Sequence, residues 1–167
     1  GANLLTGVYT VGKGVLAVAN NGPLDTRLGR PDSVIVSNGA QFQYRATNQA
    51  ASTKATLFRL SGVGPDGNGA MYNAGGFHGS YSQARWIQLQ GDTTIGSRTD
   101  RFSIGTGNTG GAGGLDGGGF TLSIKAAPGG GLIDHRGPTT NLLGIIVSNG
   151  SFGVETSSTN LGGYVLV

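Results

Sequence analysis

The stretch Ile35-Val36-Ser37-Asn38-Gly39 returns unchanged at residues 146–150. Each copy consists of two apolar residues, a small polar residue and an Asn-Gly corner, and a looser copy lies at residues 18–22. The flanks also agree, because an aliphatic residue precedes each identical copy and a phenylalanine follows it within a few residues. Short apolar segments that recur with the same turn residues predict a chain built by stacking, as in a solenoid.

The composition is that of a folded domain with an unusual surface. The chain has 167 residues, enough for one domain with a substantial core. Glycine accounts for 34 of them, far above the usual share of about 7%. Charged residues make up only 11%, so neutral polar residues and glycine must cover the surface. We therefore expect a single domain over residues 1–167, as a segment of a longer repeat protein.

Several classes of function lack the residues that they require. The net charge of +3 is spread along the chain without a basic stripe, which argues against nucleic-acid binding. The chain has no cysteine, so disulfides and thiolate metal sites are excluded. No stretch approaches the ~18 apolar residues of a membrane span. The start at Gly1 carries no signal-peptide pattern, and we expect a mature protein or an excised piece.

Helix signals are nearly absent, whereas short apolar alternations are frequent and predict an all-β chain. Clusters of Gly, Asn, Asp and Ser separate these strands, and they supply the unusual backbone angles of tight corners. The longer connections, at residues 20–32, 46–54, 61–69 and 105–119, are expected to be loops at the edge of the fold. The predicted strands are 8–11, 15–19, 33–36, 40–45, 55–60, 85–89, 101–104, 120–125, 142–147, 152–155 and 164–167.

Two all-β architectures compete for this pattern. A sandwich would use the Asn-Gly pairs as hairpin turns between antiparallel strands. A parallel β-helix would use them as corners, so that each strand stacks on the one a coil earlier. The recurring corner and the glycine-rich connections favour the β-helix. With roughly 20–25 residues per coil, we expect about six to seven coils.

The ordered succession of motifs resembles a known family. The run Gly14-Val15-Leu16-Ala17-Val18 has the form Gly-x-Leu-x-Val, and an Asn-rich loop and an apolar alternation that ends at a glycine corner follow it, at residues 20–24 and 34–40. This succession resembles the autotransporter-associated β-strand repeat. Residues 60–96 and 119–125 are similar to large passenger proteins of Gram-negative bacteria.

The resemblance implies a right-handed parallel β-helix of the passenger type, displayed at the cell surface of a Gram-negative bacterium or released from it as an extracellular protein. It implies no enzyme and no cofactor. The chain departs from the family in having no translocator β-barrel and no signal peptide. The export route therefore does not follow from the resemblance.

The two ends of the predicted solenoid suggest how it functions. The last four residues carry no charge, no proline and no turn residue, so the final coil has no evident cap. We expect the ends to stack head-to-tail on copies of the chain or on adjacent repeat modules, which builds a surface fibre or a passenger stalk. The predicted assembly interface consists of Leu4, Leu5, Tyr164, Val165, Leu166 and Val167.

A second hypothesis is an adhesin or glycan-binding module. The highest density of aromatic residues follows a Gly/Ser-rich segment, and exposed aromatic rings next to an arginine are able to stack on the sugars of an extracellular polysaccharide. The alternative for this segment is a loop that folds over the coil edge, with the lone Trp as a plug at the coil end. The predicted glycan-binding residues are Phe77, His78, Tyr81, Arg85 and Trp86.

A third hypothesis is a polysaccharide-degrading enzyme. Asp134-His135-Arg136 resembles the Ile-Asp-His segment of pectate lyases, which are also parallel β-helices and use several carboxylates to hold Ca²⁺ and an arginine as the base. The sequence shows no paired acids here, and we expect instead a corner where Asp134 accepts backbone N–H bonds and pairs with Arg136. We therefore assign no catalytic residue.

Two Gly/Asp-rich segments, residues 66–69 and 110–116, superficially resemble Ca²⁺ loops. A Ca²⁺ site needs six to eight oxygens, usually from several carboxylates, and an EF-hand needs an acid at its twelfth position. Counted from Asp66, that position is Phe77. We expect flexible turns at both segments and no metal site.

Overall fold

The computed structural model describes residues 5–19, 27–45, 56–75, 84–105, 113–127, 131–155, 161 and 163–167. These residues are almost entirely β-structure. The strands are β1 (Thr6–Val11), β2 (Gly14–Val18), β3 (Arg30–Val36), β4 (Ala40–Tyr44), β5 (Leu57–Gly62), β6 (Met71–Asn73), β7 (Trp86–Ser97), β8 (Arg101–Gly105), β9 (Gly114–Asp116), β10 (Thr121–Ala126), β11 (Leu132–Arg136), β12 (Thr139–Thr140), β13 (Gly144–Asn149), β14 (Ser151–Val154) and β15 (Val165–Leu166).

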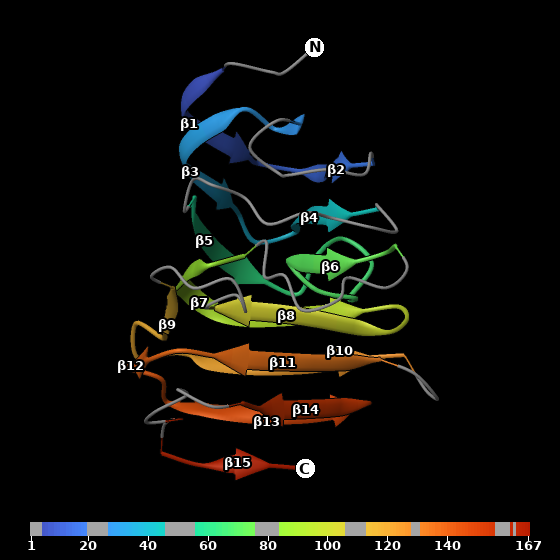
Figure 1. Ribbon diagram of the computed structural model, residues 1–167, viewed down its shortest axis with the longest axis vertical. Helices are drawn as coiled ribbons and strands as arrows, with labels where there is room; N and C mark the ends of the chain where they lie inside the picture. The colour runs from blue at the N-terminus through green and yellow to red at the C-terminus, as the bar shows by residue number, and fades with distance from the viewer. Residues whose placement is uncertain are drawn as a thin grey trace.

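The strands form a parallel β-solenoid, as the sequence predicts. Each registered pair in the described part of the chain is parallel, and it joins strands of successive coils. The first face contains β1, β3, β5, the first half of β7, β9 and β12, and the second face contains β2, β4, β6, the second half of β7, β10, β13 and β15. The third face is a separate sheet of β8, β11 and β14. Figure 1 shows the resulting rod, with β1 and β15 at opposite poles.

About four turns carry described residues on all three faces, whereas six strands or strand halves stack on the first face and seven on the second, against the six to seven coils that we expect from the sequence. The two N-terminal turns contribute β1 and β2, then β3 and β4, to the first and second faces. The connections that follow them, residues 20–26 and 46–55, lie outside the described residues. Loop predictions for those two segments therefore stay predictions, but the loops expected at residues 20–32 and 61–69 are each wrong at one end, because Arg30 starts β3 and Gly62 ends β5.

Inward side chains stack in columns and form the core. On the first face the register aligns Val34, Phe58, Ile87 and Leu115, and all four are buried. On the second face the rings of Phe42 and Tyr44, both on β4, have centroids 5.0 Å apart, and Tyr44 meets Phe102 of the third face with centroids 5.3 Å apart. Because every coil covers its neighbours, burial is nearly complete in the middle of the rod.

The repeated pentapeptide forms the same local corner in both copies but at different places in the coil. Gly39 and Gly150 both have positive φ, 82° and 79°, which glycine adopts at little cost. The first copy turns the chain from β3 on the first face into β4 on the second, whereas the second copy turns it from β13 on the second face into β14 on the third. The two copies therefore do not stack on one column, and the motif encodes a corner.

The sequence did not predict β6, β9, β11, β12 or the second half of β7. The loop expected at residues 105–119 is wrong in two places. Gly105 is the last residue of β8, and residues 114–116 form β9. These segments are either only two or three residues long or rich in glycine or charge, and parallel neighbours on adjacent coils supply their hydrogen bonds. Such tertiary pairing overrides a weak local strand signal.

Candidate functional site

The N-terminal pole is an open strand edge with exposed apolar side chains. Within the described residues, β1 pairs only with β3 and β2 only with β4, so each keeps one free edge. Leu5 is 62% exposed, and Val8 and Val15 are exposed beside it. Of the predicted interface residues at this pole, Leu5 is described and Leu4 lies outside the described residues. Val8 and Val15 were not predicted, although their apolar character on the first strands was the available signal.

The C-terminal pole is also open. Strand β15 pairs with β13 through Ile145↔Val165 and Ile146↔Leu166. Ile145 is 1% exposed, whereas Val165, one coil further in the same column, is 55% exposed because no described coil covers it. Val167 is 95% exposed, and Leu143 and Val154 add apolar surface that the sequence analysis missed.

Tyr164 behaves differently from the three residues that follow it. Its ring packs against Gly144, where an added Cβ would overlap the ring atoms. Its carbonyl accepts a hydrogen bond from the Ile145 N–H, 2.9 Å away, and its hydroxyl lies 3.2 Å from Thr121 Oγ1. Tyr164 therefore fixes the last strand to the rod, and Val165, Leu166 and Val167 are the more open part of this pole.

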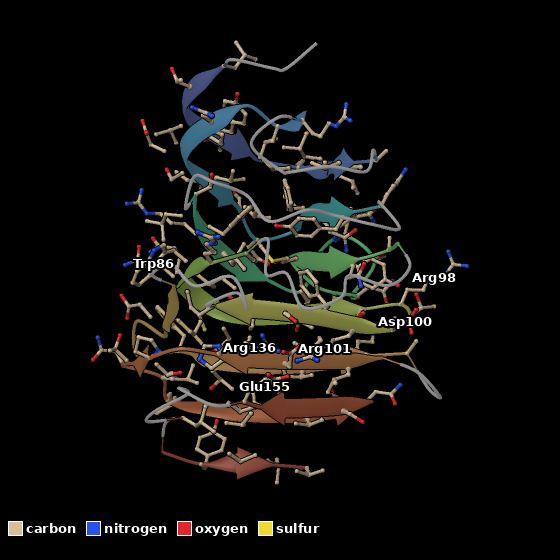
Figure 2. All side chains as sticks on the ribbon, in the orientation of Figure 1. Trp86, Arg98, Asp100, Arg101, Arg136 and Glu155 are labelled. Atoms are coloured by element: carbon tan, nitrogen blue, oxygen red, sulfur yellow. The ribbon has the colours of Figure 1, made fainter. Side chains whose placement is uncertain are left out.

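A charged cluster occupies the third face, in the C-terminal half of the rod (Figure 2). It contains Arg101 and Ser103 from β8, Asp134 and Arg136 from β11, and Glu155 directly after β14. In the register of this sheet, Phe102 and Ile133 point inward, so alternation places Ser103 and Asp134 on the outer side. Asp134 is nevertheless 0% exposed.

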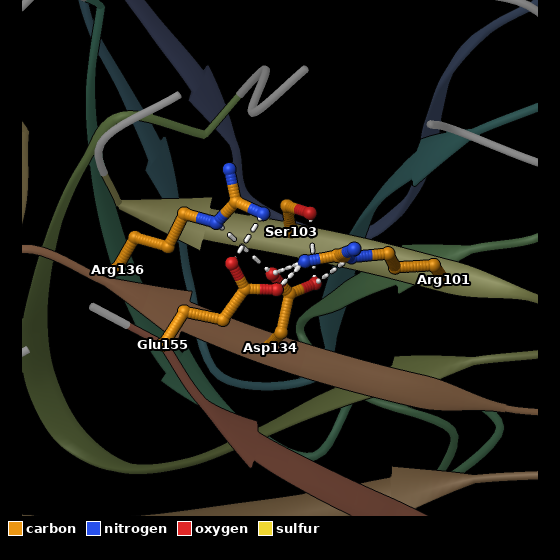
Figure 3. A network of polar contacts seen from close by, with 5 residues as sticks. All are labelled: Arg101, Ser103, Asp134, Arg136 and Glu155. Atoms are coloured by element: carbon orange, nitrogen blue, oxygen red, sulfur yellow. Dashed lines mark hydrogen bonds and ion pairs between the residues drawn. The ribbon is translucent and has the colours of Figure 1, made fainter. Parts of the chain in front are cut away.

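The contacts in this cluster are short and reciprocal (Figure 3). Arg101 donates from Nε to Asp134 Oδ1 at 3.0 Å and from Nη2 to Oδ2 at 2.8 Å, which is a bidentate pair. The Ser103 hydroxyl donates to the same Oδ1 at 2.7 Å. Arg136 lies 3.5 Å from Asp134 through its Nε and 2.5 Å from Glu155 through Nη2, and Glu155 also pairs with Arg101.

Electrostatically the cluster is balanced. Two guanidinium groups face two carboxylates, and each carboxylate oxygen has an arginine partner. Burial lowers the pKa of Arg136, the Asp134 charge opposes this shift, and the Arg101 charge adds to it. The arrangement joins three successive coils, since β8, β11 and β14 belong to different turns. Its evident chemical role is an ion-pair brace.

This geometry corrects part of what the sequence suggested for Asp134. The expected pair between Asp134 and Arg136 is present. The expected corner is wrong, because Asp134 lies in the middle of β11 and accepts hydrogen bonds from the side chains of Arg101 and Ser103. The sequence also showed no paired acids, yet stacking brings Glu155 and Asp134 onto the same arginines. Only the coil register would have revealed that pairing.

His135 faces the core. It is buried in the column of Ile104 and Val154, and its Nε2 lies 2.8 Å from Thr139 Oγ1. Burial lowers the pKa of His135, and a hydrogen bond with the Gly137 backbone and the Asp134 charge only partly oppose the shift. His135 therefore contributes a neutral polar contact inside the rod, outside the charged cluster.

Of the predicted glycan-binding residues, Phe77, His78 and Tyr81 lie outside the described residues. Trp86 starts β7 on the outer side of the first face and is 36% exposed (Figure 2). Its ring lies against Gly114, where an added Cβ would be 3.3 Å from Trp86 Cζ3. The loop that would fold over the coil edge, residues 76–83, lies outside the described residues, so the alternative role of Trp86 as a plug stays a prediction. Arg85 is half-buried directly before it.

A ladder of polar side chains runs along the same face. Arg59 Nε donates to Gln88 Oε1 at 3.2 Å, and Gln88 Nε2 donates to Asp116 Oδ2 at 3.1 Å. Asp116 also accepts from the Gly118 N–H, 3.1 Å away, and this hydrogen bond makes the largest contribution to lowering its pKa. Residues 114–116, expected as part of a flexible turn, are thus a paired strand.

The segment around Asp66 is a hydrogen-bonded turn, as expected. Burial raises the pKa of Asp66, but hydrogen bonds from Asn68 and Gln41 outweigh it and lower the pKa overall. Across the residues that the structure describes, no group of three or more His, Cys, Asp or Glu side chains is arranged to hold a metal ion. In the same part of the chain, no helix has the length and apolar character needed to cross a membrane.

Comparison with known proteins adds no relative: no family model matches the chain, and neither a curated protein nor a solved structure matches it. The resemblance to the autotransporter-associated repeat therefore stays a prediction.

The brace predicts a large effect for a small change. Asp134→Asn keeps the shape of the side chain but removes the charge that two arginines share. We expect the free energy of unfolding in urea to fall by about 3 kcal/mol, the cost of breaking a buried ion pair. The matched control Asp116→Asn, on the more open ladder, is expected to cost less than about 1 kcal/mol. An equal loss of unfolding free energy in the two variants would contradict the role of the cluster as an ion-pair brace.

His135 predicts a pH dependence of stability. Its folded pKa is lowered, so the unfolded chain binds the proton more readily, and the stabilisation is complete above about pH 6.5 and lost as pH falls through the folded pKa. We expect the unfolding free energy to fall from pH 7 to pH 5 with a slope of up to about 1.4 kcal/mol per pH unit. His135→Leu should reduce that slope, whatever its absolute stability. An unchanged slope would assign the effect to other groups.

Proposed function

We propose that this chain is a non-enzymatic structural module, a β-solenoid that stacks head-to-tail through its open end coils to build a surface fibre or passenger stalk. The observation that carries this proposal is the pair of uncovered poles. The strand edges of β1 and β2 at one pole and of β15 at the other have no partner within the described residues, and apolar side chains surround both edges.

The geometry of the poles favours a partner of the same kind. All registered strands run parallel, and parallel neighbours lie about 4.8 Å apart. A second copy, or an adjacent repeat module, placed in line would continue the ladder with the same strand direction. Such a contact joins two different surfaces, so it is heterologous and does not close, and it generates a filament.

Two further observations support an extracellular or cell-surface location of the kind found in Gram-negative bacteria. The surface is neutral and polar, with charged residues at only 11% of the chain. The order of motifs resembles the autotransporter-associated repeat, whose members are exported. The proposed partners are other copies or adjacent modules, together with extracellular polysaccharide, and no nucleic acid.

The enzyme hypothesis has less support from the charged cluster. A general base or a metal ligand needs a carboxylate oxygen that is free to act. In the cluster, arginines occupy the oxygens of both Asp134 and Glu155. We therefore favour the structural role over a polysaccharide-degrading activity, and assign no catalytic residue.

Val165→Lys tests the end stacking. Val165 continues the column below Ile145 at the open pole, so a lysine there places a charge where the next coil would pack. We expect wild-type chain to form filaments with a uniform axial repeat in negative-stain microscopy, and the variant to remain monomeric by light scattering with an unchanged circular dichroism spectrum. The control is Gln90→Lys, an exposed position of β7 on the side of the rod, which should still assemble. Filaments of Val165→Lys, or a monomeric wild type, would contradict the proposal.

Glycan binding by the segment from Phe77 to Trp86 is the second candidate function, and the outward Trp86 ring favours it. The emission of this lone tryptophan reports directly on its surroundings. We expect a saturable shift of Trp86 fluorescence with an added extracellular polysaccharide, and Trp86→Ala to weaken retention on that polysaccharide by about tenfold, the effect of ~1.4 kcal/mol. Retention that Trp86→Ala leaves unchanged would exclude this ring from a glycan site.

A further inference from the structure

A small cavity opens on the outer side of the second face, away from both poles. The register aligns Tyr72, Gly96, Lys125 and Asn149 in one outward column across four coils. Gly96 has no side chain, so the column is interrupted at its second position. The cavity beside it has a volume of about 180 Å³ and is lined by Asn68, Tyr72, Ser97, Lys125, Ala126, Ala127 and Asn149.

The turn at residues 65–69 forms a fixed wall of this cavity. Gln41 Nε2 donates to Asp66 Oδ1 at 3.0 Å and to the Gly69 carbonyl at 2.8 Å, and Lys125 Nζ donates to the Gly67 carbonyl at 2.8 Å. The backbone of Asn68 fills the space above Gly96, since an added Cβ at Gly96 would overlap the Asn68 carbonyl oxygen. Contacts from two other coils therefore hold the wall in place.

The lining is rich in donors and contains no carboxylate. Lys125 uses one of its three N–H donors on Gly67, which leaves two for a ligand. Asn68 and Asn149 are amides with N–H groups. The nearest acid, Asp66, is not part of the lining, and its oxygens accept from Asn68 and Gln41. Such a lining complements a ligand that is negatively charged and rich in acceptors.

Tyr72 adds an aromatic surface. Its ring lies over Gly96, because an added Cβ there would be 2.9 Å from Tyr72 Cδ2. Burial raises the pKa of Tyr72, the Asp66 charge adds to this shift and the Arg98 charge opposes it, so the hydroxyl stays protonated near neutral pH. The Ala126 and Ala127 methyl groups also line the cavity. A ring with apolar C–H edges therefore fits beside the donors.

We propose that this cavity binds one uronic acid residue, the carboxylated sugar of an acidic polysaccharide, with its carboxylate toward Lys125 and Asn149 and its ring against Tyr72. The volume of about 180 Å³ is below the 300–1,000 Å³ of most drug-sized sites, which suits a single sugar ring. The site is on the side of the rod, so its occupation is compatible with stacking at the poles.

The direct test is equilibrium dialysis of the full chain with radiolabelled glucuronate, in competition with unlabelled glucuronate, glucose or acetate. We expect one saturable site per chain that glucuronate displaces, with glucose and acetate each at least about tenfold weaker, because each lacks one half of the recognised chemistry. Absence of saturable binding would overturn the proposal. Equal competition by glucose would overturn the role of the carboxylate, and equal competition by acetate would overturn the role of the ring.

Two matched variants locate the site. Asn149→Asp places a carboxylate opposite that of the ligand at an exposed position, and we expect it to weaken glucuronate binding by at least about tenfold. Asn38→Asp makes the same charge change at the other copy of the Asn-Gly corner, which does not line the cavity, and it should leave binding unchanged. Tyr72→Leu should weaken glucuronate while leaving acetate unaffected. Equal losses in Asn149→Asp and Asn38→Asp would show that the sugar binds elsewhere.

Discussion

Parallel pairing between successive coils is the interaction on which the rest of this structure depends. A parallel strand cannot find its hydrogen bonds within its own coil, so the backbone of each coil is satisfied only by the coils before and after it. The same pairing sets the register, and the register aligns inward side chains such as Val34, Phe58 and Ile87 in one column. It follows that coils in the middle of the rod are covered on both sides and the two end coils on one side only.

The register also decides which distant residues meet on the outside of the rod. Arg101, Asp134 and Glu155 are far apart in sequence, yet each lies about one coil from the next, and they converge on the third face. The ladder from Arg59 through Gln88 to Asp116 arises in the same way on the first face. The two differ in burial, since Asp134 is buried and Asp116 is half-exposed. The buried brace therefore carries the larger electrostatic consequence.

The sequence predicts the class of fold because inward and outward residues alternate clearly in strands such as β5, where Phe58 and Leu60 are buried. It fails at β11, in which Ile133 and His135 point inward but alternate with charged residues that only the coil register can pair. The repeated pentapeptide predicts a corner correctly but does not predict its position in the coil, because an Asn-Gly pair determines a local turn and carries no information on which face follows. The charged cluster and the Tyr72 cavity depend on contacts between coils, so a linear pattern does not reveal them.

The ends and the sides of the rod recognise partners by different means. An open edge offers backbone donors and acceptors that any parallel strand can match, so specificity at a pole must come from the side chains around it. At the C-terminal pole, Tyr164 packs back on Gly144 and leaves Val165 and the residues after it as the exposed part. A partner that stacks there therefore meets the edge of the second face first. On the sides, recognition depends on outward columns such as that of Tyr72 and Lys125. Since backbone pairing and the inward columns maintain the stack together with the charged cluster, outward positions outside that cluster can acquire binding chemistry without disturbing assembly.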